Sequence, residues 1–236
     1  MLRSVPRQVW WIILGVIIIS FFAVRFSGNW FVGGIFLLLF ALPVLLHLKT
    51  RLEWTIFAIL SLLGFIFEFT SILVGIPYGK FLYGETLGPK FLDLVPFILP
   101  LSWPVLVFSI WSLTYNLRFK SLLAVVFLLR FDLVLDPVAV RLHMWEYLYP
   151  GIWYQVPFSN YFGWIITSLI AVTILRIANI QPDPASRLSI FIHTLFWTSC
   201  SLWLGLWWVA PIGIYTLISL FRSIFLDQSR LQQSTI

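Results

Sequence analysis

Charged residues are scarce in this chain: Asp, Glu, Lys and Arg make up only 10% of its 236 residues, whereas 61% are hydrophobic. The mean hydropathy of +0.98 lies far outside the range of soluble domains. A chain of this length accommodates several spans of ~20 residues joined by short loops and little else. We therefore expect one integral-membrane domain over residues 1–236, an all-α bundle of about eight transmembrane helices.

Cysteine and histidine are also rare, with one Cys and three His. The single cysteine, Cys200, excludes an intramolecular disulfide and a thiolate metal cluster, so we interpret it as a packing residue. Three histidines are too few for a membrane di-iron oxygenase. His143 and Glu146 have a spacing that can hold a metal, but no second pair of this kind accompanies them. We predict no metal site.

Several catalytic motifs are missing from the sequence. It contains no glycine-rich phosphate loop, no GxSxG and no aspartate-rich prenyl-diphosphate motif. The net charge of +6 does not indicate nucleic-acid binding, because the basic residues stand singly at the ends of apolar runs. That distribution is typical of membrane topology signals.

Apolar runs predict eight spans. They cover residues 9–26, 29–48, 53–74, 94–115, 119–140, 160–178, 189–207 and 209–226. The last two lie in one run that is too long for a single span, and we place the break at WVAPIG, where proline and glycine disfavour a helix. The first run has a basic start like that of a signal peptide. It lacks a small-x-small cleavage site, so we expect it to be retained.

The distribution of Lys and Arg predicts that both termini are cytoplasmic. With eight spans, ten basic residues face the cytoplasm and four face the other side. The ten are Arg3, Arg7, Lys49, Arg51, Arg118, Lys120, Arg176, Arg187, Arg222 and Arg230. Seven spans would give eight against six. The two longest loops, residues 75–93 and 141–159, then lie outside, and both are rich in glycine, proline and aromatic residues.

Polar residues lie inside the apolar runs, most clearly in RFDLVLDP at residues 130–137. Counting at ~1.5 Å per residue from the outer end, Asp136 lies ~6 Å deep, Glu68 ~9 Å and Asp132 ~12 Å. The two aspartates are four residues apart and share a helix face. Charges at such depths are costly and mark functional sites more often than structural ones. Burial and like charge favour keeping one carboxyl protonated, as a general acid requires.

Arg130 and Pro137 flank these acids. Arg130 points elsewhere on the helix, so it must pair with another span or extend toward the interface. Pro137 removes the hydrogen bond to the carbonyl of Leu133, so we expect the helix to bend or end there. The structural alternative is a set of ion pairs and hydrogen bonds between helices that involves Arg130.

Four ordered segments resemble a known family. They are EFTSILVGIPYGKFLYGETLGPK (68–90), LVPFILPLSWP (94–104), DLVLDPVAVRLHMWEY (132–147) and GIWYQVPFSNYFGW (151–164). Together they resemble the carotenoid biosynthesis proteins of the bisanhydrobacterioruberin hydratase and γ-carotene 1′,2′-hydratase type. The similarity covers roughly residues 60–165, and the first two and last two spans match only in hydropathy.

The resemblance implies a lyase of isoprenoid metabolism that adds water to the terminal C=C of an acyclic carotenoid. An acid protonates the alkene, and water captures the tertiary carbocation; no metal, nucleotide or redox cofactor is required. It implies a multi-pass protein of a prokaryotic plasma membrane, with the lipid bilayer and other carotenoid-pathway enzymes as partners.

The residues for this chemistry follow from the sequence segments above. Glu68, Asp132 and Asp136 are the candidate acids. The candidate substrate-binding residues are Tyr78, Tyr83, Trp145, Trp153, Tyr154, Asn160 and Trp164, with the aromatic rings stabilising the cation and Asn160 orienting the water. Arg130, Lys80 and Pro137 are supporting residues. Each aromatic residue has packing or an interfacial belt as its alternative role.

Three other functions remain open from the sequence. A carotenoid end-group cyclase of the lycopene type would use the same protonation but capture the cation with an internal alkene. A proton-coupled transporter would use the same carboxylates and show inverted-repeat symmetry. A non-catalytic membrane partner of another carotenoid enzyme is the third.

Overall fold

The computed structural model describes residues 5–26 and 30–226, and within these ranges it forms eight α-helices. They are α1 (Arg7–Arg25), α2 (Trp30–Leu45), α3 (Arg51–Val74), α4 (Leu99–Thr114), α5 (Lys120–Arg141), α6 (Phe158–Ile177), α7 (Arg187–Trp203) and α8 (Val209–Phe221). The helices correspond one to one with the eight apolar runs expected from the sequence. A single π-helical turn, η4 (Arg222–Leu226), extends α8.

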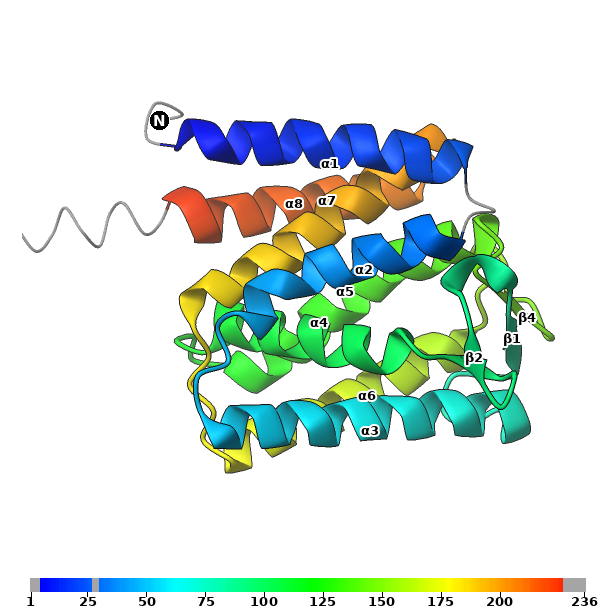
Figure 1. Cartoon of the computed structure of the whole chain (residues 1–236), viewed down its shortest axis with the longest axis horizontal. Coiled ribbons are helices and arrows are strands. Elements are labelled where there is room, and N and C mark those ends of the chain that lie inside the picture. Colours follow the sequence, from blue (N-terminus) through cyan, green and yellow to red (C-terminus); the bar gives the residue numbers. More distant parts are fainter. Residues whose placement is uncertain (1–4, 27–29, 227–236) are drawn as a thin grey trace, which may run out of the picture.

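The helices run alternately in opposite directions, so the connections gather at two ends of the bundle (Figure 1). At one end the loops before α3 and before α7 are joined by an ion pair between Lys49 Nζ and Asp183 Oδ2, at 2.6 Å. At this end α1 begins and α8 finishes (Figure 1). The long connections of residues 75–98 and 142–157 lie at the opposite end.

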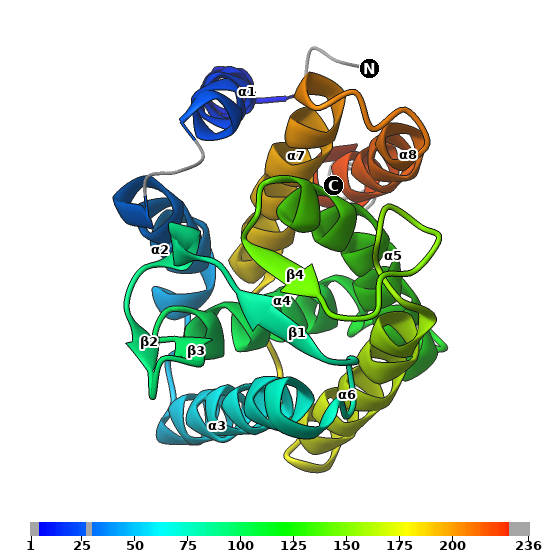
Figure 2. The ribbon, with the colours of Figure 1, turned by 90° about the vertical axis from the view of Figure 1, so that its right-hand side faces the viewer.

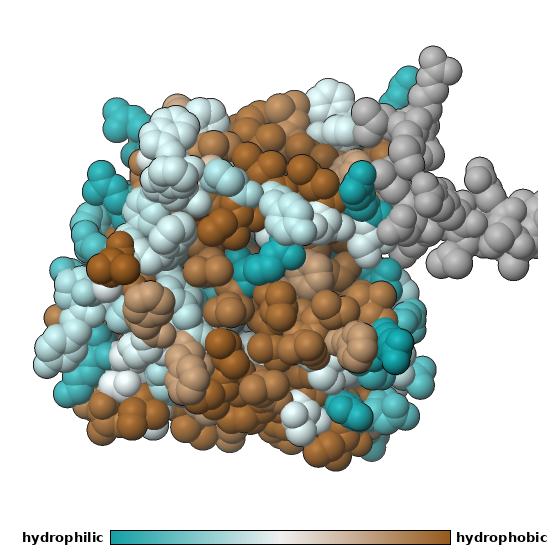
Figure 3. All heavy atoms as spheres, turned by 180° about the vertical axis from the view of Figure 1, so that it is seen from behind, coloured by the Kyte–Doolittle hydropathy of each residue, from teal (hydrophilic) through white to brown (hydrophobic). Residues whose placement is uncertain are grey.

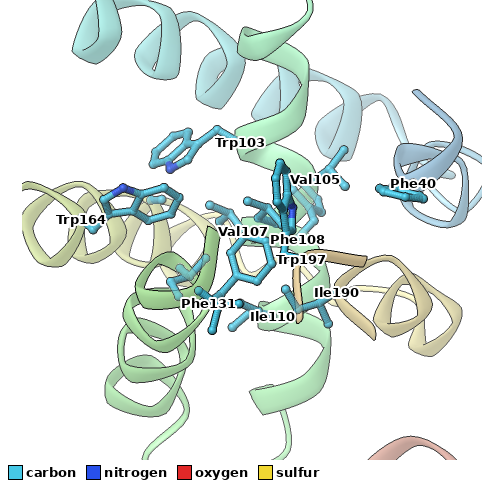
Figure 4. Packing of buried hydrophobic residues seen from close by; sticks show 14 of the residues in the cluster. Phe40, Trp103, Val105, Val107, Phe108, Ile110, Phe131, Trp164, Ile190 and Trp197 are labelled. Atoms are coloured by element: carbon cyan, nitrogen blue, oxygen red, sulfur yellow. The ribbon is translucent and has the colours of Figure 1, made fainter. Parts of the chain in front are cut away.

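Three helices form the interior of the bundle. Every residue of α4 from Trp103 to Thr114 is buried, and α5 and α7 contribute most of the remaining fully buried side chains. Figure 4 shows how Phe131 of α5 lies between Trp103 and Trp164 on one side and Phe40 on the other. These large rings come from α2, α4, α5 and α6 and belong to one buried hydrophobic cluster.

The outer surface has the character of a membrane protein. Of the described helices, α1, α3 and α6 are long and apolar enough to cross a membrane, and α2, α4 and α8 are shorter apolar helices. Hydrophobic residues cover the middle of the face in Figure 3, with hydrophilic residues toward its two ends. Many large apolar side chains of the helices are exposed, Leu62 and Ile177 among them at 60% and 80%. This is the arrangement expected when lipid, not water, surrounds the helices.

The long loops contain short strands that the all-α prediction did not include. Strand β1 (Phe81–Tyr83) pairs antiparallel with β4 (Trp145–Tyr147), and β2 (Lys90–Phe91) pairs with β3 (Val95–Pro96). Figure 2 shows β1 and β4 crossing the end of the bundle. The strands form because loop backbone groups covering an apolar bundle need hydrogen-bond partners of their own.

Of the two alternatives predicted for Pro137, a bend or an end of the helix, the structure excludes the end, and it also moves the predicted break between α7 and α8. Helix α5 does not end at Pro137 but continues to Arg141, since a proline near a helix end removes only one hydrogen bond and the four residues beyond it complete another turn. The break between α7 and α8 falls at residues 204–208, before the predicted WVAPIG. Pro211 lies in the first turn of α8, where its missing N–H has no helical partner to lose.

Candidate active site

The two aspartates of α5 meet an amide from α6. Asp132 and Asp136 are 0% and 3% exposed and face the neighbouring helix. Asn160 Nδ2, in the first turn of α6, donates to Asp132 Oδ2 at 2.9 Å and to Asp136 Oδ2 at 2.6 Å. One amide group therefore holds both carboxyls in a fixed relation, and it does so because residues i and i+4 of a helix lie one above the other.

The paired strands β1 and β4, which we call the β1–β4 ribbon, contribute a tyrosine that contacts Asp136. Tyr147, the last residue of β4, donates its hydroxyl to Asp136 Oδ2 at 2.7 Å. Asp132 Oδ1 is buried and has no hydrogen-bond partner among the described residues. A full charge at this oxygen would be neither solvated nor paired, so a protonated Asp132 fits the position better than an ionised one.

Glu68 approaches from the opposite wall, on α3. This helix begins with a capping box between Thr50 and Glu53 and ends at Gly75, whose φ of +85° is readily adopted only by glycine. These signals set the length of α3 and the position of Glu68 near its outer end. Glu68 Oε2 accepts a 2.5 Å hydrogen bond from the hydroxyl of Tyr83 in β1.

A cavity of about 70 Å³, which we call the acid cavity, separates Glu68 from Asp136. Its walls come from α3, α4, α5, α6 and the β1–β4 ribbon. The lining residues are Gly64, Glu68, Tyr78, Phe81, Tyr83, Leu99, Ser102, Trp103, Leu106, Leu135, Asp136, Trp145, Tyr147, Asn160 and Trp164. Two acids and one amide thus face a space whose other walls are mostly apolar or aromatic.

The β1–β4 ribbon closes the outer side of this cavity with aromatic rings. Residues alternate between the two faces of a strand, and the register sets Phe81 opposite Tyr147 and Tyr83 opposite Trp145. The ring centroids of these pairs are 5.6 and 5.9 Å apart. The intervening Leu82 points away and is 57% exposed. One face of the ribbon is therefore an aromatic cover over the acids.

The tyrosines of the two loops remain hydrogen-bond donors. Burial raises the pKa of Tyr147 well above its usual value, and the nearby carboxyl of Asp136 raises that pKa further. Burial and then Glu68 raise the pKa of Tyr83 in the same way. Both phenols keep their protons at neutral pH, so each can orient a carboxyl without competing as the acid.

Tyr78 is the third buried tyrosine of this region. Its hydroxyl donates to Thr167 Oγ1 of α6 at 3.1 Å, and its backbone N–H donates to Ser71 Oγ at 3.0 Å. Its ring lies 6.3 Å from that of Trp164. Gly163 makes this contact possible, since a Cβ there would lie 2.7 Å from both Pro77 O and Tyr78 Cδ1. A small residue in α6 thus sets how closely the loop and its tyrosine approach the cavity.

Several residues expected at the site lie elsewhere. Trp153 and Tyr154 stack edge to face, 5.3 Å apart, and do not line the acid cavity. Tyr154 borders a separate cavity beside Pro137. Their place follows from the Gly151–Gln155 turn, which folds this part of the loop back on itself. Lys80 is in the ribbon, where its carbonyl accepts the N–H of Leu148, and its side chain does not line the acid cavity.

Arg130 faces α8 instead of the acids. Its guanidinium donates to Thr216 Oγ1 at 3.1 Å and lies 4.5 Å from the ring centroid of Tyr215. Among the described residues it forms no ion pair with an acid. The interpretation of the aspartates as structural ion-pair partners of Arg130 therefore has no support in the geometry.

Sequence reasoning missed several residues of the cavity, three of them aromatic. Tyr147 binds Asp136 directly, Phe81 belongs to the aromatic cover, and Trp103 forms part of the α4 wall. A signal for the first two was present, because FLY and WEY each place aromatic residues two apart, the spacing of one face of a strand. Trp103 has no such signal, since it lies in a helix that is apolar on every side.

Comparison with known proteins shows which family this chain belongs to. The family model described as "Carotenoid biosynthesis protein" matches residues 8–221, and the chain belongs to that family. A protein named "Bisanhydrobacterioruberin hydratase" from Haloarcula japonica is 40% identical over 123 residues. That match covers 48% of this chain and 41% of the relative's own length. No solved structure matches the chain.

Proposed function

We propose that this protein is an integral-membrane hydratase that adds water to the terminal C=C of an acyclic carotenoid. The observation that carries the proposal is the placement of Glu68, Asp136 and Asn160 on the walls of one aromatic cavity inside an apolar bundle. The family membership and the name of the Haloarcula relative support a carotenoid as substrate.

The first step is protonation of the alkene by Asp136. The π electrons form a new C–H bond at the terminal alkene's less substituted carbon, and the other carbon becomes a tertiary cation. Asp136 is left as a carboxylate, which Tyr147 and Asn160 stabilise through the hydrogen bonds they already donate to its Oδ2. Asp132 shares the Asn160 amide and keeps this donor in place.

The second step is capture of the cation by water. The water oxygen forms the C–O bond, and the proton that it releases passes to Glu68, on the opposite wall from Asp136. The sum of the two steps is H and OH added across the double bond, and proton exchange between the carboxyls and solvent restores the acid. The bond from Tyr83 to Glu68 orients this carboxyl toward the cavity.

The aromatic walls stabilise the cation between the two steps. Tyr78, Trp103, Trp145 and Trp164 line the same space as the acids, and the faces of such rings attract positive charge. Their second role is to limit access of water, so that a single water reaches the cation. Burial in a dry cavity keeps the carboxyl protonated until an alkene arrives, and the preorganised donors to Asp136 then stabilise the carboxylate that forms.

The membrane topology is part of the same proposal. The eight helices span the membrane as a bundle, with both termini in the cytoplasm and the β1–β4 ribbon on the opposite side. The excess of basic residues at the end that holds Lys49 and Arg187 favours this orientation. The substrate then reaches the acid cavity from the hydrocarbon layer, in which carotenoids dissolve.

The test is expression in a host that accumulates lycopene, followed by chromatography with mass detection. The proposal predicts a product heavier than its precursor by the mass of one water for each end that reacts. A product of unchanged mass with altered retention would show a cyclase in its place. Unconverted lycopene, with the protein present in the membrane, would contradict both enzymes and favour the transporter or partner role.

A further inference from the structure

A second cavity lies directly beside the acid cavity. It has a volume of about 70 Å³ and is enclosed by α1, α2, α4, α5, α7 and the loop segments near Thr86 and Met144. Its lining is almost wholly apolar and contains many aromatic rings: Phe26, Phe36, Phe40, Phe131, Trp145, Phe196 and Trp197. We call it the apolar cavity.

The two cavities share a wall. Leu99, Ser102, Leu106, Leu135 and Trp145 line both of them. Trp103 and Trp164 line the acid cavity only, and Phe131 and Phe40 line the apolar cavity only; Figure 4 shows these four residues in the same core. A ligand whose end occupies the acid cavity can therefore extend past these shared residues into the apolar cavity without crossing a helix.

The apolar cavity also reaches the surface of the bundle. Phe26, at the outer end of α1, lines it and is 58% exposed. Ala23 and Leu37, from α1 and α2, form the adjoining part of the wall. Phe26 is thus a point at which the lining of the cavity meets the surface, and a long hydrocarbon that leaves the cavity past it would continue into the bilayer.

His193 is the largest of three polar side chains in the lining, the others being Thr86 and Ser102. His193 of α7 is 2% exposed, lines the cavity, and has no hydrogen-bond partner at Nδ1 or Nε2 among the described residues. Its ring stands edge to face with those of Phe40 and Phe131, at centroid distances of 5.0 and 6.0 Å. An imidazole held among π systems donates its N–H weakly to a π face, and a conjugated chain offers such a face.

We infer that the apolar cavity binds the conjugated chain of the carotenoid next to the reacting end, and that the rest of the chain leaves the protein between α1 and α2. This inference rests on the proposed function for the identity of the ligand. It goes further in assigning the residues of α1, α2 and α7 to substrate binding. The inference requires a ligand with a long, flat and apolar chain.

The experiment uses protein purified from lycopene-producing cells and measures the bound carotenoid derived from lycopene. Lycopene and any hydrated product are counted together, and this sum is the retained lycopene compared between variants. Leu37→Trp fills the apolar cavity from α2 without touching the acid cavity. Leu38→Trp is the matched control, because Leu38 is the next residue of the same helix, is 46% exposed and lines neither cavity. We expect Leu37→Trp to lower the lycopene bound per protein at least tenfold and Leu38→Trp to leave it within twofold of the wild type.

A second variant, Ala23→Phe, fills the same cavity from α1 and gives the same comparison if Leu37→Trp does not accumulate in the membrane. Equal retention by the cavity-filling variants and Leu38→Trp would overturn the inference, as would a wild-type protein that retains no lycopene. The proposed function is assessed separately, by whether the wild type forms a hydrated product. If the wild type hydrates lycopene and Leu37→Trp retains as much lycopene as the wild type, the proposed reaction is supported and the proposed chain-binding site is contradicted.

Discussion

At the scale of single residues, Asp136 differs from the other two acids in the number of hydrogen bonds that its carboxyl accepts. Its Oδ2 accepts from both Tyr147 and Asn160, whereas Asp132 accepts from Asn160 alone and Glu68 from Tyr83 alone. Donors of this kind stabilise the carboxylate that remains after proton transfer. For this reason the proposed mechanism assigns the proton transfer to Asp136, whose carboxylate would remain stabilised after the proton is released.

Replacing Asp136 by asparagine tests this role. The amide is nearly isosteric, so we expect Asp136→Asn to accumulate in the membrane at the wild-type level. It cannot deliver a proton to carbon, and loss of a general acid lowers rates by roughly 10²–10⁴-fold. The measurement is hydrated carotenoid per unit of protein. Near-normal hydration would shift the acid to Glu68, and failure to accumulate would make the carboxyl structural.

Tyr147→Phe tests the orientation of the same acid. The change removes one hydroxyl and one of the two hydrogen bonds to Asp136, and bonds to charged groups contribute about 1.5–3 kcal/mol each. We expect hydration to fall about tenfold or more, with the protein still folded. Tyr149→Phe is the matched control, since Tyr149 is 74% exposed and lines neither cavity. Equal activity of the two variants would separate Tyr147 from the chemistry.

At the scale of elements, the site depends on how closely the loop before β1 approaches α6. Gly163 leaves room for Pro77 and Tyr78, and an added Cβ would overlap backbone as well as side chain. Overpacking of this kind costs about 1–3 kcal/mol. Helix α6 and the loop must separate to relieve it, which moves Tyr78 and Trp164 away from each other.

Gly163→Ala is therefore expected to lower both the thermal stability of the detergent-solubilised protein and the rate of hydration. Gly15→Ala is its control, because a Cβ at Gly15 meets nothing within 4 Å. A melting curve and a conversion assay on the two variants make the comparison. If Gly163→Ala were as stable and as active as Gly15→Ala, the close contact between the loop and α6 would not be needed for stability or for hydration.

The sequence predicted the helices well because each contains a sustained apolar run, and only the boundaries moved. The β1–β4 pairing was not predictable in the same way, since strands of three residues carry little local signal and form through contacts between loops far apart in the chain. That pairing decides which loop residues reach the acids. Tyr83 and Trp145 therefore line the cavity with Glu68, and so does Tyr147, which was not predicted. Trp153 and Tyr154, which were predicted to bind substrate, do not line it.

At the scale of the whole molecule, the bundle divides into two ends of different character. One end holds short loops and the Lys49–Asp183 ion pair, and the other holds the long aromatic loops over the acid cavity. Spacing along the helices indicated similar depths for Glu68 and Asp136. It could not indicate which helices are neighbours, and the bundle's packing order provides that information.

A topology measurement tests the orientation of these ends. We expect a reporter fused after Ile236 to be active only in the cytoplasm, because the positive-inside bias assigns both termini there. A fusion in the exposed turn near Ile152, which is 90% exposed, should report the opposite side. A C-terminal reporter active only outside the cell would contradict the eight-span arrangement.

The central claim is that the protein protonates a carotenoid alkene and that water captures the resulting cation. The most direct measurement is conversion of lycopene by the purified protein in D₂O, followed by back-exchange of the hydroxyl and mass analysis of the product. The account predicts a tertiary alcohol that carries one deuterium on carbon for each double bond hydrated. An alcohol without carbon-bound deuterium, or a labelled product that contains no oxygen, would contradict it.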